Sequence, residues 1–197
     1  GTIIKFPIEF YATQVKNSEM ILETNDFTVE TIILNHRIPC TGFIFKQKIK
    51  LRKIIKEKTN QLEIPAAYYP LLKKGIDFTD TSGNIHKAAD LTAEPDIPRS
   101  YAYCSDTVAD GTYLHHLQGV NTLYHESTFM YDMVDRAKET FHTTALEAGE
   151  IAKKMDVEKL LIGHFSARYR DLTPLLLEAR SVFPESYLAN EGETFMI

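Results

Sequence analysis

This sequence has few cysteines and no long apolar run. Only Cys40 and Cys104 occur among its 197 residues, and each stands beside an apolar stretch. Buried free thiols are therefore favoured over a disulfide, and the cysteine spacing does not indicate a zinc ribbon. No apolar segment approaches the roughly 18 residues that a membrane span needs, and no signal-peptide pattern opens the sequence. We therefore expect a cytoplasmic protein.

The charge is acidic overall but unevenly distributed. A net charge of -5 argues against a general nucleic-acid binder, and no DNA partner is expected. Residues 46–87, however, carry ten Lys or Arg against four acidic residues, and the apolar, aromatic stretch Ile64 to Pro70 lies among them. This composition predicts a basic arm that suits a phosphate backbone, with a solvated basic helix surface as an equal alternative. The candidate phosphate contacts in the arm are Lys50, Arg52 and Lys53.

The spacing of apolar residues predicts strands first and then an alternation of strands and helices. Hydrophobic content of 44% is enough for one domain with its own core. The second half of the sequence is typical of a layered α/β fold. Predicted strands cover Ile3–Ala12, Met20–Thr24, Phe27–Leu34, Thr41–Lys46, Ser100–Ser105, Asn121–His125 and Val157–Gly163, helices cover Thr144–Met155 and Thr173–Phe183, and residues 76–99 are predicted to form a hairpin and loop.

Ionisable residues follow the predicted strands where each strand ends. His36, Asp106, Glu126 and His164 all stand at such places. Strand ends of layered α/β proteins open onto a common crevice, so these side chains are expected to converge. Any one histidine alone is more often a structural residue, but two imidazoles and a carboxylate together suit Zn²⁺. Three further histidines lack this context and are predicted to be loop residues: His86, His115 and His116.

Four short motifs carry a resemblance to a known family. They are Ser-Asp-Thr (105–107), His-Glu-Ser-Thr-Phe (125–129), His-Thr-Thr (142–144) and His-Phe-Ser-Ala-Arg-Tyr (164–169). In this order, and with Asn35 to Phe43 ahead of the arm, they resemble the C-terminal portion of ribonuclease Z, a tRNA 3'-processing endonuclease family of the metallo-β-lactamase superfamily. The resemblance implies a partial αββα sandwich over residues 1–197, treated as one domain, with residues 46–87 as a projecting arm.

The resemblance also implies roles for individual residues. His36 would bind one zinc ion, His164 the second, and Asp106 would bridge both. His142 would donate a proton to the leaving oxygen, and Glu126 would orient it. Two further residues would position the scissile phosphate, although the guanidinium could equally form a structural ion pair: Ser166 and Arg168.

The family's substrate is pre-tRNA, and its arm usually holds the tRNA from the other subunit of a homodimer. This sequence departs from the family at the arm tip, which lacks a Gly-Pro, and it does not contain the H-x-H-x-D-H motif that supplies most zinc ligands. We therefore expect the chain to be an inactive fragment that binds zinc weakly. An uncovered apolar sheet face would also make it self-associate.

Two other functions stay open. Another hydrolase of the superfamily, such as a phosphodiesterase or an arylsulfatase relative, would share Asp106 and His164 but would not need the basic arm. A non-catalytic tRNA-binding module would have lost the zinc motif altogether. The basic arm favours a tRNA enzyme over the first alternative, and residues upstream of Gly1 would decide on the second.

Overall fold

The computed structural model describes residues 5–197. The chain divides into two compact units. One is formed by residues up to Lys46 together with Arg99–Ile197, and the other, which we call the inserted unit, is Gln47–Pro98. Of the predicted arm, 46–87, all but Lys46 lies in the inserted unit. Among residues 5–197, no helix has the length and apolar character that crossing a membrane requires.

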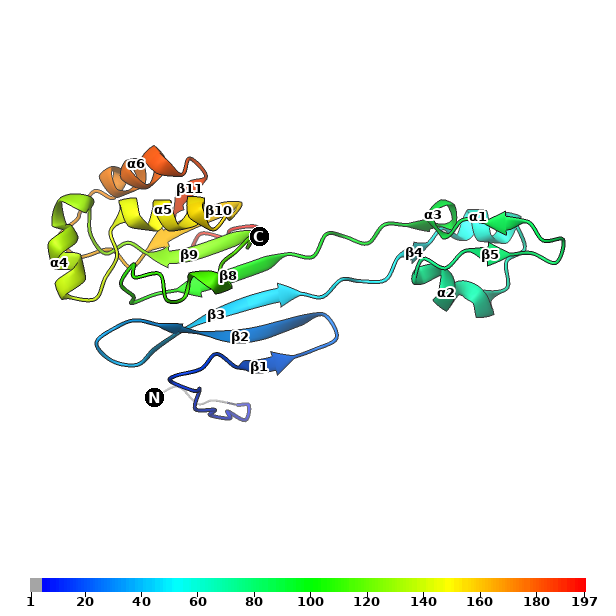
Figure 1. The fold of residues 1–197 in the computed structure, drawn as a ribbon, viewed down its shortest axis with the longest axis horizontal. Helices are drawn as coiled ribbons and strands as arrows, with labels where there is room; N and C mark the ends of the chain where they lie inside the picture. Colours follow the sequence, from blue (N-terminus) through cyan, green and yellow to red (C-terminus); the bar gives the residue numbers. More distant parts are fainter. Residues whose placement is uncertain (1–4) are drawn as a thin grey trace. The chain divides into compact units, whose positions relative to one another are not determined.

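The first unit is built on a seven-stranded sheet with the order β1-β2-β3-β8-β9-β10-β11 (Figure 1). β8, β9, β10 and β11 are parallel, whereas the β1-β2 and β3-β8 pairs are antiparallel. The strands are β1 (Met20–Glu23), β2 (Phe27–Leu34), β3 (Cys40–Gln47), β8 (Ser100–Cys104), β9 (Thr122–Glu126), β10 (Lys159–Gly163) and β11 (Ser186–Leu188).

The described residues of this unit form three α-helices: α4 (Val134–Glu139), α5 (Ala145–Lys154) and α6 (Thr173–Val182). α5 begins at a capping box, because the Thr144 hydroxyl accepts from the backbone N–H of Glu147 and the Glu147 carboxylate accepts from that of Thr144. α5 and α6 pack closely at Gly149, where a Cβ would lie 2.8 Å from the carbonyl oxygen of Ala179. Short 3₁₀ helices cover Leu114–His116 and Tyr131–Met133.

The two faces of the sheet differ in chemistry. Alternate residues of β8, Ala102 and Cys104, are fully buried in the core that the sheet forms with α5 and α6. Tyr101 and Tyr103, which alternate with them along β8, turn their aromatic rings to the opposite face. There Tyr103 stacks on Tyr124 with ring centroids 4.7 Å apart, and Phe45, beside Tyr101, is 38% exposed.

The sequence predicts most elements of this unit, and the α/β architecture is confirmed. The strand predicted over Ile3–Ala12 is wrong where it is described, because residues 5–12 contain no strand, and its first two residues lie outside the described residues. Alternating apolar residues alone do not make a strand, since a strand also needs a neighbour for its backbone groups. Three histidines were also predicted to be loop residues. Of these, His86 lies in a strand of the inserted unit, and His115 and His116 lie in a 3₁₀ helix of the first unit.

The inserted unit has a small core of its own. Four buried residues pack with partly buried neighbours that include Phe78: Ile64, Leu72, Ala88 and Leu91. A hairpin within 76–99 is confirmed by the pairing of β5 with β6. The elements are β4 (Lys53–Ile54), α1 (Lys56–Gln61), a 3₁₀ helix (Ala66–Tyr68), α2 (Tyr69–Lys73), β5 (Phe78–Thr79), β6 (Ile85–His86), α3 (Ala88–Leu91) and β7 (Thr92–Ala93).

Candidate active site

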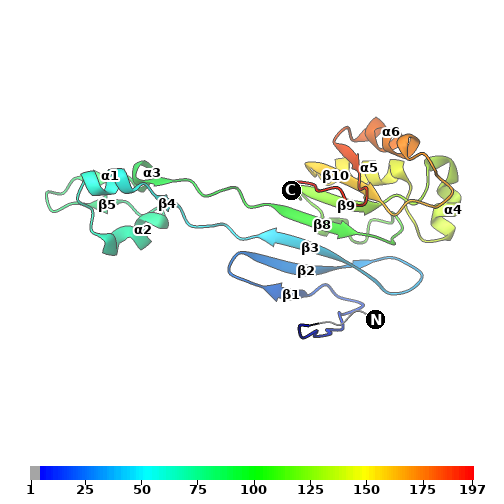
Figure 2. The same ribbon diagram turned by 180° about the vertical axis from the view of Figure 1, so that it is seen from behind.

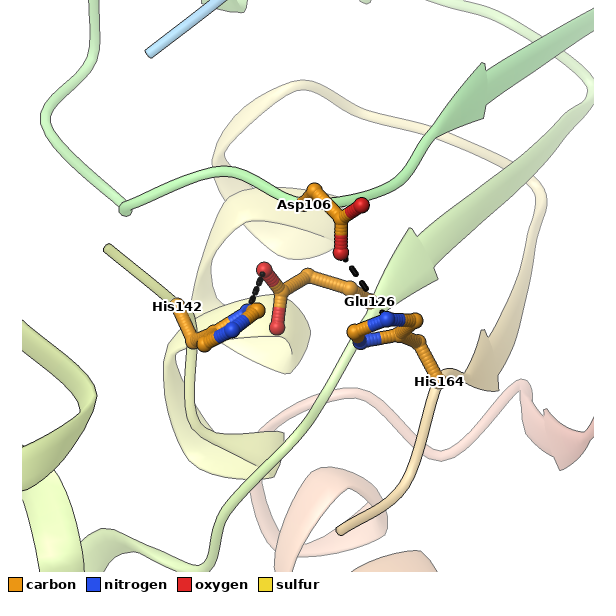
Figure 3. A group of neighbouring side chains, drawn as sticks. All are labelled: Asp106, Glu126, His142 and His164. Atoms are coloured by element: carbon orange, nitrogen blue, oxygen red, sulfur yellow. Dashed lines mark hydrogen bonds and ion pairs between the residues drawn. The ribbon is translucent and has the colours of Figure 1, made fainter. Parts of the chain in front are cut away.

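Four ionisable side chains converge at the carboxyl ends of the parallel strands. Asp106, Glu126, His142 and His164 each offer one ligand atom, and these atoms all lie within 4.8 Å of one another (Figure 3). The parallel register explains the convergence, because it aligns Cys104 of β8 with His125 of β9, and Glu126 of β9 with Gly163 of β10. The residues after each strand therefore emerge side by side.

The backbone is strained at three places around this cluster. Asp106, Phe141 and His164 have φ angles of 43°, 59° and 57°. L-residues other than glycine rarely adopt this left-handed conformation, and each case costs about 1–3 kcal/mol unless the surroundings impose it. Two of the three residues belong to the cluster, and Phe141 directly precedes His142. Strain concentrated in this way is typical of a functional site.

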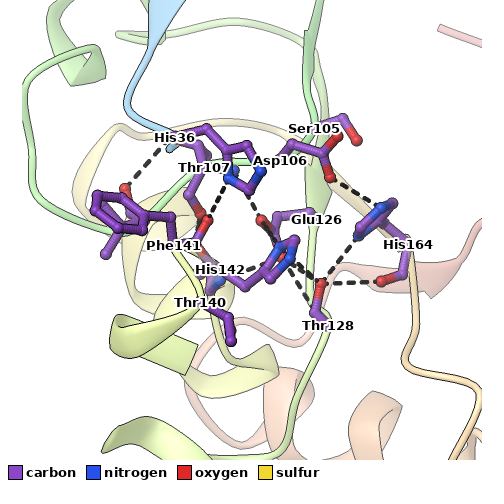
Figure 4. Close-up of polar contacts among 12 residues, drawn as sticks. His36, Ser105, Asp106, Thr107, Glu126, Thr128, Thr140, Phe141, His142 and His164 are labelled. Carbon is purple, nitrogen blue, oxygen red and sulfur yellow. Dashed lines mark hydrogen bonds and ion pairs between the residues drawn. The ribbon is translucent and has the colours of Figure 1, made fainter. Parts of the chain in front are cut away.

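Glu126 is a fully buried carboxylate with an unusually complete set of donors. Its Oε1 accepts from the backbone N–H of Thr107 and from Nδ1 of His142, both at 2.8 Å (Figure 4). Its Oε2 accepts from the Thr128 hydroxyl at 2.6 Å and from the backbone N–H of Thr143 at 3.1 Å. Burial alone would raise the pKa of Glu126, but these hydrogen bonds outweigh it and hold the pKa below its usual value. Glu126 is therefore an anion at neutral pH.

The buried anion acts on His142. The hydrogen bond to Glu126 raises the pKa of His142 above the usual value, against the opposing effect of burial. Because Nδ1 donates to Glu126, the remaining ring nitrogen, Nε2, is the one that holds the exchangeable proton of the imidazolium. A histidine arranged in this way carries a proton near neutral pH and releases it from Nε2. That is the behaviour of a general acid.

Asp106 and His164 have the features of metal ligands. Oδ1 of Asp106 is buried and accepts no hydrogen bond, although Nε2 of His164 lies only 2.8 Å away. The two atoms are close but are not aligned as donor and acceptor. A buried carboxylate oxygen without a donor is costly, and a cation contacting both atoms would remove that cost. Carboxylate oxygen and imidazole nitrogen are ligand types that suit Zn²⁺.

His36 lies beside the cluster rather than within it. Its ring centroid is 5.2 Å from that of His142, and its Nδ1 donates to the carbonyl oxygen of Phe141 at 2.9 Å. That hydrogen bond leaves Nε2 of His36 without a proton in the neutral ring, as a metal ligand requires. The structure thus brings the three predicted ligands, the predicted proton donor His142 and the residue predicted to orient it, Glu126, into one region.

The neighbouring His125 has a different role. Its side chain is fully buried, its Nδ1 donates to the carbonyl oxygen of Glu126, and its Nε2 accepts from the Tyr113 hydroxyl at 2.7 Å. Burial lowers the pKa of His125. It is a neutral residue with both nitrogens occupied, and it holds the end of β9 in place.

The residues predicted to contact phosphate are less closely grouped. Arg168 is exposed, with its guanidinium 5.1 Å above the ring of Phe129, and the backbone N–H of Ser166 donates to the carbonyl oxygen of Thr128. The candidate phosphate contacts of the arm, Lys50, Arg52 and Lys53, lie in the inserted unit. There Arg52 pairs with Glu94, and Lys53 lies 3.3 Å from Asp96.

Three threonines of the site were missed from the sequence. Thr107, Thr128 and Thr143 supply donors to Glu126, and each follows an ionisable residue within its motif by one or two positions. The signal was therefore present in the motifs themselves. It is easily missed, because hydroxyl and backbone donors carry no charge and are neither metal ligands nor proton carriers.

Comparison with curated proteins shows similarity over the full length of the chain. It is 43% identical over 197 residues to Ribonuclease Z of Cytophaga hutchinsonii, and 41% identical over 189 residues to Ribonuclease Z of Parabacteroides distasonis. These alignments cover 100% and 96% of the chain but only 63% and 62% of the relatives. The chain thus spans about three fifths of the length of the curated relatives it matches. No family model matches it.

Solved structures show the fold. The metallo-β-lactamase fold protein YhfI from Bacillus subtilis aligns with 93% of the chain and 54% of its own, with a TM-score of 0.58 and 18% identity. The short form of human tRNase Z aligns with 90% of the chain and 46% of its own, with a TM-score of 0.53 and 22% identity. The sheet and its helices therefore have the metallo-β-lactamase fold over the part that this chain covers.

Proposed function

We propose that this chain is part of a ribonuclease Z, an endoribonuclease that removes the 3' trailer of pre-tRNA by metal-dependent hydrolysis of a phosphodiester bond. The observation that carries the proposal is the pairing of a buried anion, Glu126, with a histidine of raised pKa, His142, next to two side chains that suit a metal. Such a site could support several hydrolytic reactions. The similarity of nearly the whole of this chain to proteins named Ribonuclease Z favours this one.

His142 protonates the leaving group. When the phosphodiester bond breaks, the departing ribose oxygen acquires negative charge and needs a proton. His142 supplies it from Nε2, while its Nδ1 stays bound to Glu126. Because Glu126 is buried and anionic, it keeps the imidazolium favourable and fixes the plane of the ring. Such a general acid typically contributes about 10²- to 10⁴-fold in rate.

Metal ligands of the site come from three segments of the chain. Asp106, His164 and His36 would hold zinc. When bound, the metal supplies hydroxide near neutral pH and neutralises charge on the phosphoryl oxygens. Three protein ligands for two ions fall short of the three per ion that a catalytic zinc normally has. We therefore expect weak zinc binding and no cleavage by the 197-residue chain itself.

The substrate and setting follow from the same proposal. Pre-tRNA is the partner, and phosphate contacts come from Ser166 and Arg168 in the first unit and from Lys50, Arg52 and Lys53 in the inserted unit. We further propose a homodimer in the cytoplasm. The aromatic sheet face with the partly exposed Phe45 supports association, since it presents apolar surface that a neighbour would cover.

Cleavage of a 3'-extended pre-tRNA tests the proposal. The 197-residue chain is compared with a version extended upstream to the length of the relatives, each with Zn²⁺ or Mn²⁺ added. The longer protein is expected to cut and the shorter one not to. His142→Ala in the longer protein is expected to lower cleavage about 10²- to 10⁴-fold.

Other outcomes contradict parts of the proposal. If the 197-residue chain cuts alone, its own ligands are sufficient and the expected dependence on further residues is wrong. If the longer protein binds pre-tRNA without cutting it, a binding module is the better assignment. If it cuts small phosphodiesters but not pre-tRNA, it is another hydrolase of the same fold.

A further inference from the structure

One hydroxyl group lies between the Glu126–His142 pair and His164, a proposed metal ligand. Thr128 follows β9 by two residues, and only 6% of its surface is exposed. Its Oγ1 is 2.6 Å from Oε2 of Glu126, 3.0 Å from Nδ1 of His164, 3.1 Å from the carbonyl oxygen of His164 and 3.3 Å from Nδ1 of His142 (Figure 4). A hydroxyl has one proton and two lone pairs, so these neighbours compete for it.

The Thr128 hydroxyl donates its hydrogen bond to Glu126. The carboxylate is the nearest acceptor, and a hydrogen bond to an ionised acceptor is about twice as strong as one to a neutral carbonyl. The lone pairs of Oγ1 then face two imidazole nitrogens. Nδ1 of His142 already donates to Oε1 of Glu126 at 2.8 Å. Nδ1 of His164, at 3.0 Å, is therefore the donor that Thr128 accepts from.

This assignment fixes the tautomer of His164. With its proton on Nδ1, the neutral ring has a lone pair on Nε2, the atom that lies 2.8 Å from Oδ1 of Asp106. Nε2 and that oxygen are not aligned as donor and acceptor, so no hydrogen bond there favours the opposite tautomer. A lone pair on Nε2 is also what a metal ligand requires.

We infer that Thr128 is a positioning residue that selects the Nδ1–H tautomer of His164 while it holds the carboxylate of Glu126, and so prepares metal ligand and proton carrier together through one hydroxyl. Only the metal that Nε2 would bind rests on the proposed function. The tautomer itself is a property of the chain without metal.

Nitrogen NMR of the histidine rings tests the inference directly. The metal-free 197-residue chain is labelled with ¹⁵N-histidine and studied at alkaline pH, where imidazoles are neutral. His164, identified by the signal lost in His164→Gln, is expected as the Nδ1–H form in the wild type and in Thr128→Ser. In Thr128→Val, which has the same shape without a hydroxyl, the Nε2–H form is expected to predominate, because Asp106 is then the better acceptor.

His125 provides the control in the same spectra. Its Nδ1 is bound to the carbonyl oxygen of Glu126, so its tautomer is expected to stay the same in every folded variant. A change at His164 with His125 unchanged shows that the site has altered and the fold has not. The Nε2–H form of His164 in the wild type overturns the inference without any variant, as does an unchanged His164 in Thr128→Val.

Metal affinity gives the second readout. Loss of a hydrogen bond behind a metal-bound histidine typically costs about 10- to 100-fold in affinity, so Thr128→Val is expected to weaken Zn²⁺ binding by that factor in competition with a chelator. Thr128→Ser is expected to restore it. Equal affinities in the wild type and Thr128→Val contradict the positioning role. Failure of pre-tRNA cleavage by the extended protein contradicts the proposed function but leaves the tautomer result standing.

Discussion

The two units of this chain use ionisable residues in opposite ways. In the first unit, Glu126 is fully buried, His142 is held against it, and strained backbone at Asp106 and His164 aims the side chains at one point. In the inserted unit, charged groups lie at the surface and pair with one another. Lys53 and Asp96 are 63% and 83% exposed, and Arg52 pairs with the exposed Glu94.

The two arrangements differ in how strongly each charge affects its neighbours. A buried and fully hydrogen-bonded carboxylate shifts the pKa of its neighbour and does chemistry, whereas exposed ion pairs are worth about 0–1 kcal/mol and are screened by salt. In the proposed function, the first unit would break the phosphodiester bond and the inserted unit would hold the charged RNA. The predictions below separate these two roles.

The largest effect is expected for the proton carrier. In the longer protein, His142→Gln should lower kcat for pre-tRNA about 10²- to 10⁴-fold and leave KM nearly unchanged, because the lost proton is needed only in the transition state. Single-turnover cleavage measures the chemical step. The matched control is His115→Gln, at an exposed histidine of the same unit outside the cluster, which should retain full activity. A rise in KM with normal kcat would instead place His142 in binding.

The next effect concerns independent folding. Leu72 is fully buried in the core of the inserted unit, so Leu72→Ala should destabilise that unit by about 2–5 kcal/mol. Hydrogen exchange should show faster exchange in α2 and unchanged protection in β9 and β10. Its neighbour Leu71 is 37% exposed, and Leu71→Ala should have a much smaller effect. Equal loss of protection in both units would show that they unfold together. The inserted unit would then not fold independently of the first unit.

A smaller effect is expected from pH. In the chain freed of metal by a chelator, Glu126 raises the pKa of His142, and the histidine lowers that of Glu126. The histidine's contribution to stability is full below its unfolded pKa and is lost as pH rises through the higher folded value. The carboxylate's contribution is full above its unfolded pKa and is lost as pH falls through the lower folded value. The pair therefore stabilises most between the usual values of about 4.5 and 6.5.

Glu126→Gln tests that sign. The variant should lose most stability to urea within this window and less at alkaline pH, where His142 is neutral in both proteins. An NMR titration should place the pKa of His142 lower in the variant than in the wild type. If His142 titrates in the variant as it does in the wild type, Glu126 does not raise the pKa of His142.

Local signals made part of this structure predictable. β2 matches its predicted range, Phe27–Leu34, because apolar spacing within eight residues defines it. α5 begins one residue after the start of its predicted range, Thr144–Met155, where the side chains of Thr144 and Glu147 complete the capping box by themselves. Both features depend on residues close in sequence. The strand predicted within 5–12 depended on a distant partner, and it is absent from these residues.

The site was predictable only in outline. The ionisable residues stand at strand ends, and parallel strands bring their ends together, so convergence followed from the pattern. The donors to Glu126 come from three separated segments at Thr107, Thr128 and Thr143, and no local pattern specifies that they meet one carboxylate. The basic arm predicted over 46–87 does not include Glu94 and Asp96, which pair with Arg52 and Lys53 and are distant from them in sequence.

The smallest expected effect follows from that pairing. If the inserted unit holds RNA phosphates, Asp96→Asn should release Lys53 from its ion pair and tighten pre-tRNA binding about two- to fivefold, while Lys53→Gln should weaken it by a similar factor. Binding over a salt series measures both, and the slope should become steeper in the first variant and shallower in the second. Lys138→Gln, in α4 of the first unit, is the matched control and should leave the slope unchanged. If Asp96→Asn and Lys53→Gln shift binding no more than Lys138→Gln does, the ion pairs of the inserted unit serve its fold alone, and RNA must be held by the first unit.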